Sequence, residues 1–505
     1  MLNYQQWLET PGKVVVILVQ IERTPGTVTN YFSTHNITVD GFDYAGVIKN
    51  SFDITEAINT DYSASISYGS IDIINGNGEL DTNLTTNYIW VNKPIRVYIG
   101  GLPQPGSSPT LSNDFELVFS GLISDIDCKD RSTLTFKVRD SLEKLNTSLT
   151  ETLLGNYFNG VDNVPTATYN NQNKNSLKPL CFGEVFNVTP LVSDPVNLEY
   201  MVNGATTEQI IEVRDNGVPV LFTTGSGIPS GSFRLLRNPA GTITCSLQGV
   251  KQSVDTTTGS VSAVYDAAVK NLILVILRSY GKTLAASEID LPSFASSYAT
   301  EAAGVYLSDR INVLQLCQDL AKSSGCILTV TRLGKVKLLD LTIPTSASVT
   351  ITDSDMFLNS LSVSQRIPVV AGFKIGGAKN YTVQNNLVTA IPQQHKDAFA
   401  SEYLESISAD ATVKTNYSIT TEPTVESSYL ISDVEATSIA IKKLNLFKAA
   451  RTVYKMKCTA KYLSVQLGTA VAITSSRFGL SSTYGLVINT KPDWLSGNIE
   501  IEVLV

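Results

Sequence analysis

The stretch KVVVILVQIE, residues 13–22, shows the character of the chain best. An unbroken run of β-branched and aliphatic residues is typical of a strand that is buried on both faces. Further along, NKPIRVYIGG (92–101) and STLTFKVRD (132–140) alternate apolar and polar residues, which predicts strands with one face on a core. Asp40-Gly41 predicts a hairpin turn, because glycine tolerates a positive φ. We therefore expect the first 155 residues to be mainly strand.

Helical periodicity is confined to a few segments. Leucines at 142, 145, 149 and 153 predict a helix after the N-terminal strands, and the apolar residues of 261–276 predict a second one. A third helix is expected to begin at the N-cap Ser308 and to stop at Gly325. The strands CILTVTR and KVKLLDLTI should follow it, joined by a turn at Leu333-Gly334. This central region therefore has the pattern of an α+β unit.

The C-terminal region returns to strand. Ser432 and Glu435 form a capping-box pattern, which predicts a helix that runs to about Ala450. The chain ends on NIEIEV, residues 498–503, in which apolar residues alternate with Glu500 and Glu502. This alternation predicts a strand with its glutamates on one face.

The length of 505 residues exceeds what one hydrophobic core usually holds, so several domains are expected. The pattern predicts a mainly β fold with an α+β centre, in which two β-domains, each with an accompanying helix, flank smaller inserted domains. The expected order is an N-terminal β-domain at 1–155, an inserted small β-rich domain at 156–255, an α+β domain at 256–345, and a C-terminal β-domain at 346–505 with a polar insertion near 380–430.

The charge balance argues against a nucleic-acid-binding role. The formal net charge is −8, charged residues make up 17% of the chain, and no run of lysine and arginine forms a basic stripe. The N-terminus lacks the basic start and apolar core of a secretory signal, and the longest apolar runs are too short for a membrane span. We therefore expect synthesis in the cytoplasm and no membrane span.

Histidine and cysteine give no sign of a metal or nucleophile site. The two histidines, His35 and His395, have no plausible partner nearby in the sequence, so exposed or structural roles are expected. No two cysteines have the C-x-x-C spacing of a zinc or iron–sulfur site, and buried free thiols are expected. The six cysteines stand at positions 128, 181, 245, 317, 326 and 458.

Clustered carboxylates are the next candidates for chemistry. Asp125, Asp127 and Asp130 lie between two predicted strands, and Asp353 and Asp355 lie in ITDSDMF, where Asp353 could cap a short helix. A glycosidase needs two carboxylates close together in a cleft. Turn and capping roles are far commoner for acids in such positions and are the roles expected here.

Two glycine-containing motifs depart from the patterns that they resemble. NGNGELD (75–81) resembles a calcium loop, but Leu80 occupies the position that requires glycine. Gly281-Lys282-Thr283 resembles the end of a P-loop, but Ile276 stands where the first glycine belongs. We therefore predict no catalytic, metal or cofactor residues and no enzymatic activity. Gly225, Gly227 and Gly231 have the wrong spacing for a dinucleotide-binding loop. Gly372, Gly376 and Gly377 fit strand and turn positions.

Several longer strings, taken together and in order, resemble tail proteins from long-tailed phages of Gram-negative bacteria. They extend from about residue 13 to the C-terminus and cover most of the chain. They are SIDIINGNGELD (70–81), NKPIRVYIGG (92–101), FELVFSGLISDI (115–126), LTFKVRDSLEKLN (134–146), KPLCFGEVFNVTPLV (178–192), GVYLSDRINVLQLCQDLAKSSGCILTVTRLGKVKLLDL (304–341) and LGTAVAITSSRFGLSSTYGLVINTKPDWLSGNIEIEV (467–503).

The family that these strings resemble is that of baseplate hub, or tail-tip hub, proteins. The resemblance implies a structural virion protein in which the β-domains at 1–155 and 346–505 are tube-like β-barrel domains, each with an accompanying helix. It also implies that three subunits form a homotrimer ring that continues a hexameric tube. It implies as partners a distal tail or tail tube protein, a central fibre or spike protein and a tape measure protein, and it implies passage of viral DNA during genome ejection without specific binding. The cysteine spacing does not support the iron–sulfur cluster of some related proteins, so no cofactor is expected.

Two other functions stay open. A tail-associated carbohydrate-binding module for host adsorption would also be acidic and rich in Thr and Asn. A tail-associated cell-wall hydrolase would need convergent acids in a cleft. For a hub, we expect an acidic or neutral channel wall that does not retain DNA, with Glu500 and Glu502 as candidates for it. The sequence does not assign their face to the channel or to the exterior, and the alternative is that these acids only keep the protein soluble.

Overall fold

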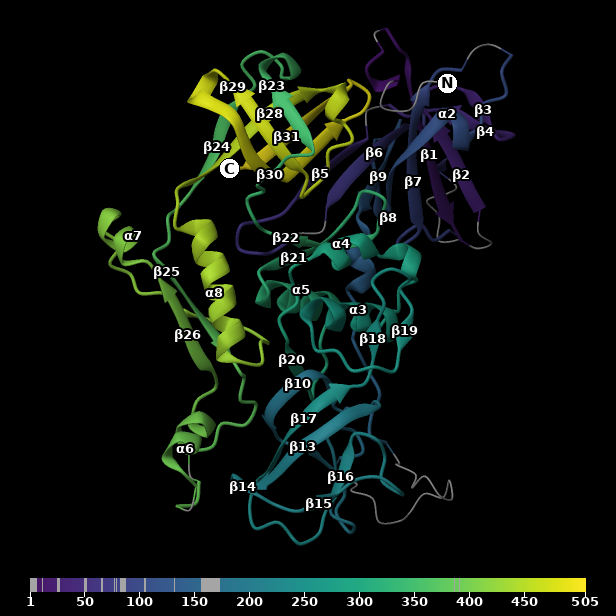
Figure 1. Ribbon diagram of the computed structural model, residues 1–505. Coiled ribbons are helices and arrows are strands. Elements are labelled where there is room, and N and C mark those ends of the chain that lie inside the picture. Colours follow the sequence, from purple (N-terminus) through teal and green to yellow (C-terminus); the bar gives the residue numbers. More distant parts are fainter. Residues whose placement is uncertain are drawn as a thin grey trace. The chain divides into compact units, whose positions relative to one another are not determined.

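The structure is a computed structural model of the chain (Figure 1). Strand is its predominant conformation, so the predicted mainly β architecture is confirmed. The closed barrels expected from the sequence are not found, because none of the sheets closes within the residues that the structure describes. Those residues are 7–10, 12–24, 28–49, 52–64, 67–76, 78, 80–81, 88–103, 106–130, 132–155, 173–385, 387–389 and 391–505.

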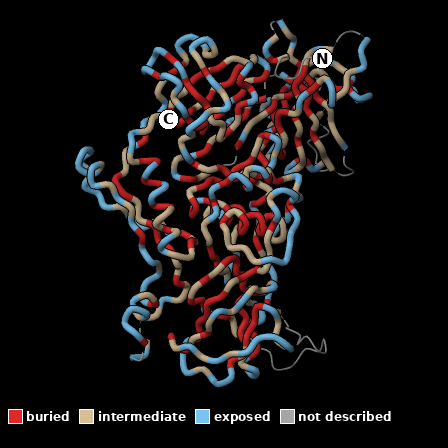
Figure 2. The backbone as a smooth tube through the Cα atoms, in the orientation of Figure 1, coloured by how far each residue is buried: buried red, intermediate tan, exposed pale blue. Residues whose placement is uncertain are grey.

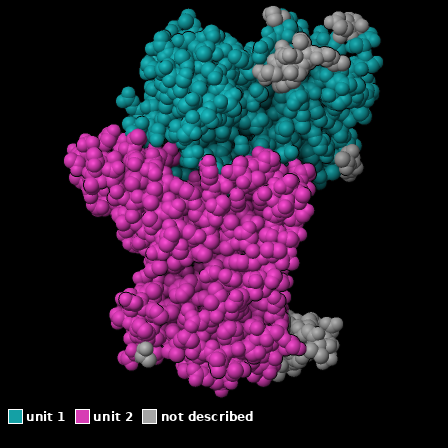
Figure 3. All heavy atoms as spheres, viewed as in Figure 1, with its two compact units in different colours: residues 1–144, 328–368, 450–505 teal, residues 145–327, 369–449 magenta. Residues whose placement is uncertain are grey.

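The chain forms two compact units, which are coloured separately in Figure 3. Unit 1 combines residues 1–144, 328–368 and 450–505, and unit 2 combines residues 145–327 and 369–449. Each unit is therefore built from segments that are far apart in the sequence. The four predicted domains stay a prediction, because one compact unit can hold more than one domain.

Unit 1 is built almost entirely from strands. Short 3₁₀ turns and the one-turn helix α2 (Leu111–Asp114) interrupt them. The strands of its large sheet are β1 (Val15–Arg23), β2 (Val28–Ser33), β3 (Ile37–Val39), β4 (Phe42–Gly46), β5 (Asp53–Ala57), β6 (Tyr68–Ile74), β7 (Pro94–Gly101), β8 (Phe115–Asp130), β9 (Thr133–Arg139), β23 (Val349–Thr352), β24 (Ser362–Ile367), β28 (Arg451–Thr459), β29 (Ala470–Ser475), β30 (Leu480–Asp493) and β31 (Asn498–Leu504).

N-terminal and C-terminal strands share this sheet. Its main path runs β24-β28-β31-β30-β5-β6-β9-β8-β7-β1-β2-β4-β3, and β29 joins it through β30. The junction is the antiparallel pair of β5 with β30, in which Glu56 lies opposite Thr490 and Ala57 opposite Asn489. The N-terminal and C-terminal strands thus join in one open sheet instead of closing as two barrels, and β24 and β3 end its path.

Strand β1 is buried on both faces, as the sequence predicted. Ile17 and Val19 point into the main core of unit 1, whereas Val16 and Leu18 pack with Tyr44 in a second cluster on the other face. Opposite orientations of neighbouring side chains follow from the two-residue period of a strand. The apolar run within residues 13–22 is unbroken because each face of β1 packs against a hydrophobic cluster.

The predicted turns and alternating strands are also confirmed. Asp40 and Gly41, with φ of 51° and 79°, form the two-residue turn between β3 and β4. Strand β7 contains the predicted alternation of Ile95, Val97 and Ile99, all of which are buried. The closing strand β31 likewise buries its apolar residues and directs its glutamates to the other face.

Aromatic packing connects the distant segments of unit 1. The ring of Phe52 stacks on Trp494, with centroids 5.5 Å apart and planes at 11°. Phe119 packs on Phe52 from β8, with centroids 4.8 Å apart. Rings from both the N-terminal and the C-terminal segments therefore share one core.

A buried ion pair lies at the junction of β5 and β30. The Arg332 guanidinium donates to the Glu56 carboxylate at 2.6 Å, to the Leu463 carbonyl at 2.7 Å and to the Thr490 hydroxyl at 2.9 Å. The Thr490 hydroxyl in turn donates to Glu56 at 2.7 Å. The guanidinium carbon lies 5.9 Å from the Trp494 ring centroid. A charge buried this deeply is tolerated only with such a full set of partners.

Unit 2 combines small sheets with helices. Figure 2 shows that the buried residues of this unit lie mainly in these sheets and helices. Residues 156–172, at the start of the predicted inserted domain, lie outside the described residues. The strands are β10 (Leu180–Val188), β11 (Leu191–Asp194), β12 (Glu199–Met201), β13 (Thr207–Asp215), β14 (Val218–Pro219), β15 (Phe222–Thr223), β16 (Ser232–Leu235), β17 (Ile243–Val250), β18 (Ser253–Val254), β19 (Val261–Ser262), β20 (Gly304–Leu307), β25 (Gly372–Gly377), β26 (Leu404–Ala409) and β27 (Val425–Ser427). The helices are α3 (Val269–Ser279), α4 (Leu291–Ser296), α5 (Val313–Ser323), α6 (Gln393–Ala400), α7 (Ala411–Asn416) and α8 (Asp433–Phe447). The hairpin of β21 (Cys326–Val330) and β22 (Val336–Asp340) begins where the chain passes from unit 2 to unit 1.

Helix α8 has the predicted start but accompanies a different sheet. The Ser432 hydroxyl accepts from the N–H of Glu435 at 3.2 Å, which confirms the cap. The helix packs on β25 and β26 in unit 2 (Figure 1), and it does not belong to the unit that holds the C-terminal strands. The prediction that each β-domain carries its own helix is therefore wrong for this helix.

Three other helix predictions need correction. The leucines of 142–153 form only a 3₁₀ turn at Ser141–Leu145, after which the backbone N–H groups bond to distant carbonyls and the chain is irregular. Helix α3 begins eight residues later than expected, because residues 261–262 pair as strand β19. Helix α5 is capped by Asn312, whose side chain accepts from Gln315 N–H, and not by Ser308.

The Arg332 network yields a stability prediction. Changing Arg332 to Ala leaves the Glu56 carboxylate buried without its cation, so unit 1 should lose about 3–5 kcal/mol of unfolding free energy. All three tryptophans, at positions 7, 90 and 494, belong to unit 1, so denaturant titration followed by tryptophan fluorescence reports on this unit. The control is Lys455→Ala, which removes an exposed pair and should cost less than about 1 kcal/mol. Equal losses in the two variants would contradict the prediction.

Candidate functional site

Lysine and glutamate side chains alternate across the outer face of the C-terminal strands. The register of β28, β31 and β30 places Lys455 opposite Glu502, and it places Lys457 and Lys491 on either side of Glu500. The prediction that the two glutamates share a face is confirmed. The same face holds lysines as well, so it is mixed in charge and not purely acidic.

Most of these groups are held by specific contacts. Lys455 forms an ion pair with Glu500 at 2.6 Å, and this hydrogen bond raises the pKa of the lysine. Glu502 accepts from the Ser364 hydroxyl at 2.8 Å and from the Asn489 amide at 3.3 Å. A face of fixed, alternating charges is suited to contact with another polar surface, and it provides no carboxylate pair in a cleft.

The acids of the β8–β9 region have structural roles. Asp125 and Asp127 flank the Lys137 ammonium at 3.4 and 3.8 Å on the exposed side of the sheet. Asp130 accepts from the N–H and hydroxyl of Ser132, and these bonds lower its pKa. The expected turn role is confirmed for Asp130, whereas the other two acids belong to a surface ion pair.

The second acidic pair also has structural contacts, but the expected cap is wrong for Asp353. Asp355, not Asp353, bonds to the start of the 3₁₀ turn, where it accepts from the N–H of Thr352 at 2.9 Å. Asp353 accepts from the N–H of Ser476 at 3.2 Å, and hydrogen bonds from Ser475 and Ser476 lower its pKa. The two side chains therefore support two different backbone segments.

The glycine motifs lie in turns and strands. In the calcium-like loop, Asn75 donates to the Asp81 carboxylate at 2.6 Å, and its own oxygen accepts from the N–H of Leu80; residues 77 and 79 of this motif lie outside the described residues. Gly281 follows the end of α3, whereas a P-loop precedes its helix. Gly225, Gly227 and Gly231 have the positive φ of turn glycines, and the group at 372–377 lies in β25.

Histidine and cysteine positions give little chemistry. His35 follows β2 with its Nδ1 atom 3.0 Å from the Thr34 hydroxyl, and His395 lies in α6. Five of the cysteines are buried free thiols as predicted, but Cys128 is exposed. No group of three metal-binding side chains occurs among the described residues. In that same part of the chain, no helix has both the length and the hydropathy to span a membrane.

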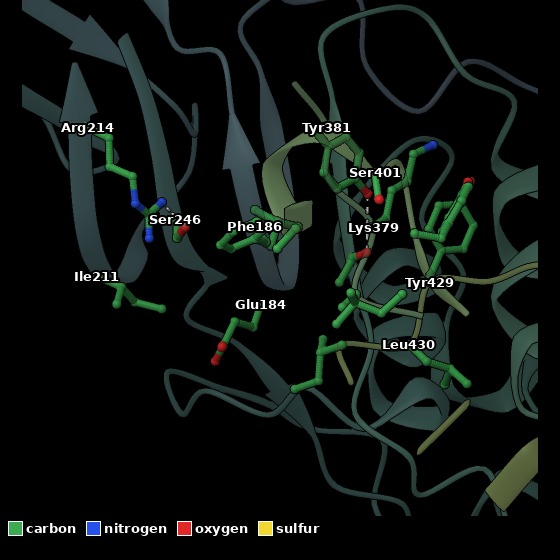
Figure 4. A pocket seen from close by; sticks show the side chains of 17 residues that line it. Glu184, Phe186, Ile211, Arg214, Ser246, Lys379, Tyr381, Ser401, Tyr429 and Leu430 are labelled. Atoms are coloured by element: carbon green, nitrogen blue, oxygen red, sulfur yellow. Dashed lines mark hydrogen bonds between the residues drawn. The ribbon is translucent and has the colours of Figure 1, made fainter. Parts of the chain in front are cut away.

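Unit 2 contains a cavity that the sequence did not predict, with a volume of about 310 Å³ (Figure 4). Strands β10, β13 and β17 form one wall, and the segments around residues 378–404 and 429–431 form the other. Asn187 of β10 anchors the second wall through its side-chain amide, which donates to Asn380 at 2.9 Å and to the Thr382 carbonyl at 2.7 Å. The cavity is therefore a feature of one unit with fixed walls.

One cation lies among aromatic rings at the cavity wall. The Arg214 guanidinium lies 5.3 Å from the ring centroids of both Phe186 and Phe399, which stack on each other. It donates to the Ser246 hydroxyl at 3.0 Å and forms an ion pair with Glu212. Burial lowers the pKa of Arg214, and the Glu212 carboxylate opposes this effect. This cation is already bonded within the unit.

The opposite wall is rich in tyrosine. Tyr381 accepts from the N–H of Tyr306 at 3.1 Å, and burial raises its pKa. The Lys379 ammonium lies 5.2 Å from the ring centroid of Tyr381 and 5.7 Å from that of Tyr403, and Tyr429 also lines the cavity. Partly exposed aromatic rings with polar groups between them suit an amphipathic ligand.

These cavity residues were missed because they share no motif. Arg214 and Tyr381 are 167 positions apart, and only the fold brings them to one cavity. The one usable signal was the recurrence of tyrosine at 381, 403 and 429 within a stretch that the composition marked only as polar.

Comparisons with known proteins give weak likenesses. No protein-family model and no curated protein matches the chain. The 43 kDa tail protein of prophage MuSo2 from Shewanella oneidensis is 11% identical, with a TM-score of 0.40 over 97% of this chain and 96% of that chain. A tail protein from Neisseria meningitidis MC58 is 10% identical, with a TM-score of 0.38 over 97% of both chains. The prophage tail protein gp18 from Listeria monocytogenes EGD-e is 7% identical, with a TM-score of 0.37 over 97% and 94%. Such scores establish neither a shared fold nor a function.

A buried carboxyl in unit 1 predicts a pH dependence. Burial raises the pKa of Asp140 to about 6, although the N–H groups of Ser67 and Leu142 donate to it at 2.6 and 3.0 Å. The folded state therefore binds the proton more tightly than the unfolded state does, where the pKa is about 3.9. Proton binding by Asp140 therefore adds roughly 3 kcal/mol to the free energy of unfolding below pH 4. This stabilisation is lost as the pH rises through 6.

The measurement compares the wild type with Asp140→Asn. Unfolding is monitored by tryptophan fluorescence across pH 4 to 6. As the pH rises, the wild type should lose roughly 3 kcal/mol of unfolding free energy relative to the variant. A difference that stays constant over this range would show that Asp140 keeps its ordinary pKa.

Proposed function

We propose that this chain is a structural virion protein of a phage tail tip, a hub-type ring component that connects the tail tube and distal tail protein to the central fibre or spike. The sequence strings that resemble tail-tip hub proteins support this role. The observation that carries it is the open sheet of unit 1, in which N-terminal and C-terminal strands unite and whose path ends at β3 and β24. Strand edges of this kind are ready sites for pairing with another chain.

The edge at β3 can be described in detail. The two-residue turn makes Val39 and Phe42 a hydrogen-bonded pair, so the next pair, Thr38 and Asp43, is of the non-bonded type. The N–H and C=O of Thr38 therefore point away from β4, toward the free edge. The Thr38 hydroxyl donates to the Asp43 carboxylate at 2.6 Å, which directs the side chain toward β4 and away from the free edge.

The remaining parts of the proposal follow from the same role. Three subunits assemble into a ring through which viral DNA passes, the location is the tail tip or baseplate of the virion, and the chain has no enzymatic activity. The charged face of β28, β31 and β30 supports passage without retention, because its lysines alternate with glutamates and do not form a basic stripe.

Assembly through the β3 edge can be tested with one backbone change. Mass photometry of the purified wild type should show a trimer. Thr38→Pro removes the outward N–H without breaking a bond to β4, so the trimer fraction should fall at least tenfold.

The matched control is Thr38→Val, which loses the hydroxyl but keeps the N–H and should remain trimeric. Circular dichroism verifies that both variants are folded. A wild type that stays monomeric at high concentration would overturn the ring, and a folded, trimeric Thr38→Pro variant would exclude the β3 edge as the contact.

A tail-associated carbohydrate-binding role is the second candidate, and the cavity of unit 2 favours it. A sugar ring has apolar faces that stack on aromatic rings and hydroxyls that bond to polar side chains. Tyr381, Tyr403 and Tyr429 provide the rings, and Glu184 and Lys379 provide polar groups.

This second role predicts binding to bacterial surface oligosaccharides on a glycan array. Tyr403→Ala should weaken binding roughly tenfold, because one stacking face is lost. Tyr298→Ala, at an exposed tyrosine of unit 2 that does not line the cavity, is the control. An array without signal would exclude this role.

A further inference from the structure

Glu184 of β10 places a carboxylate in the wall of the unit 2 cavity (Figure 4). The residue is half-buried, and its Oε2 atom accepts from the Gln248 amide at 2.9 Å. Among the residues that the structure describes, no lysine or arginine forms an ion pair with it. The charge of Glu184 is therefore available to a ligand that enters the cavity.

The two-residue period of the strands explains why Glu184 faces the cavity. Val185 packs in the core cluster of the sheet, so its neighbours Glu184 and Phe186 point to the opposite face. Ser246 of β17 lies on that face too, because its neighbour Leu247 packs in the same core. Glu184, Phe186 and Ser246 all line the cavity. The carboxylate thus lies on the polar face of the sheet, which is the face that borders the cavity.

The cations of the cavity lining, Arg214 and Lys379, are each balanced by an acid. Arg214 forms an ion pair with Glu212. The Lys379 ammonium lies 4.0 Å from the Glu402 carboxylate. Because each of these cations has an acid of its own, the additional carboxylate of Glu184 makes this group of charges net negative.

The charges in the surroundings of Glu184 do not reverse this balance. Burial raises the pKa of Tyr265, and the nearby charges of Glu184 and Asp266 add to that effect. Glu208 acts on the same phenol, but it is paired with Lys251 at 2.9 Å. Asp266 accepts from uncharged amide groups, so it adds a further negative charge. A ligand in the cavity therefore meets an excess of negative charge, which favours a cationic group.

We propose that the cavity of unit 2 binds a sugar unit with a free, protonated amino group. This inference rests on the carbohydrate-binding role proposed for the cavity, and it names the class of sugar. Tyrosine rings of the cavity wall stack on the apolar face of the sugar, and the Glu184 carboxylate accepts from its ammonium group. Such a charge-assisted bond is stronger than a bond to a neutral hydroxyl or N-acetyl group.

The size and charge of the cavity both limit the ligand. A volume of about 310 Å³ is at the lower end of the range for small-molecule sites, which suits a short glycan unit. An acidic sugar would be repelled by the excess negative charge, and a neutral sugar would leave that charge without a counter-ion. An amino sugar satisfies both the aromatic wall and the carboxylate.

Isothermal titration calorimetry of the full-length protein tests the proposal at mildly acidic pH, where sugar amines are protonated. The ligands are the linear trisaccharides of glucosamine, N-acetylglucosamine and glucose in identical linkage. The glucosamine trisaccharide should bind at least tenfold more tightly than the other two, because only this ligand supplies ammonium groups. The three ligands are compared on the wild type, so this measurement needs no variant.

Glu184→Gln removes the charge and keeps an oxygen that can accept from Gln248. This variant should bind the glucosamine trisaccharide roughly tenfold more weakly than the wild type does, and it should bind all three sugars alike. The matched control is Glu151→Gln, at an exposed glutamate of unit 2 outside the cavity lining, which should keep the wild-type preference. Thermal melts verify that both variants are folded.

The outcomes separate this inference from the carbohydrate-binding role on which it rests. No binding of any sugar, in the calorimeter or on the glycan array, would overturn both. Equal binding of the three trisaccharides would leave the role in place and overturn the inference, as would a signal on the array without binding of the glucosamine trisaccharide. A folded Glu184→Gln variant with the wild-type preference would also overturn the inference.

Discussion

The buried ion pair of Arg332 with Glu56 is the constraint on which unit 1 depends. Glu56 comes from the N-terminal segment, Arg332 from the middle segment, and Thr490 and the Leu463 carbonyl from the C-terminal segment. Removing two charges from water costs several kcal/mol per ion, so the pair is stable only when all of these partners are in place. The network therefore favours the pairing of β5 with β30, which joins the two terminal β regions in one sheet.

The sequence predicted the elements whose signals are local. The apolar run at 13–22, the Asp40-Gly41 turn, the cap at Ser432 and the alternation in 498–503 each depend on residues that are close in the chain, and each is confirmed. The predictions failed where long-range contacts decide the structure. The leucines at 142–153 have helical spacing, but loop residues from distant parts of the chain bond to that backbone. Residues 261–262 pair as a hairpin instead of opening a helix.

The candidate sites could not be predicted for the same reason. Nothing in CILTVTR marks Arg332 as the buried cation of a network, since its acceptors are far along the chain in both directions. The cavity of unit 2 joins Arg214 to tyrosines that lie more than 160 residues later. Among the acids, the turn role of Asp130 was predicted correctly because its contacts involve neighbouring residues, whereas the ion pair of Asp125 and Asp127 with Lys137 joins two strands.

The charged face of unit 1 shows how pairing across strands changes an interpretation made along one strand. Glu500 and Glu502 alone would make the closing strand acidic, but the register sets lysines of β28 and β30 beside them. Charges of opposite sign a few ångströms apart cancel at distances beyond the Debye length, so such a face neither strongly attracts nor strongly repels a polyanion. In the ring that we propose, a wall of this kind would leave DNA without fixed contacts, so repulsion from a uniform acidic lining is not required.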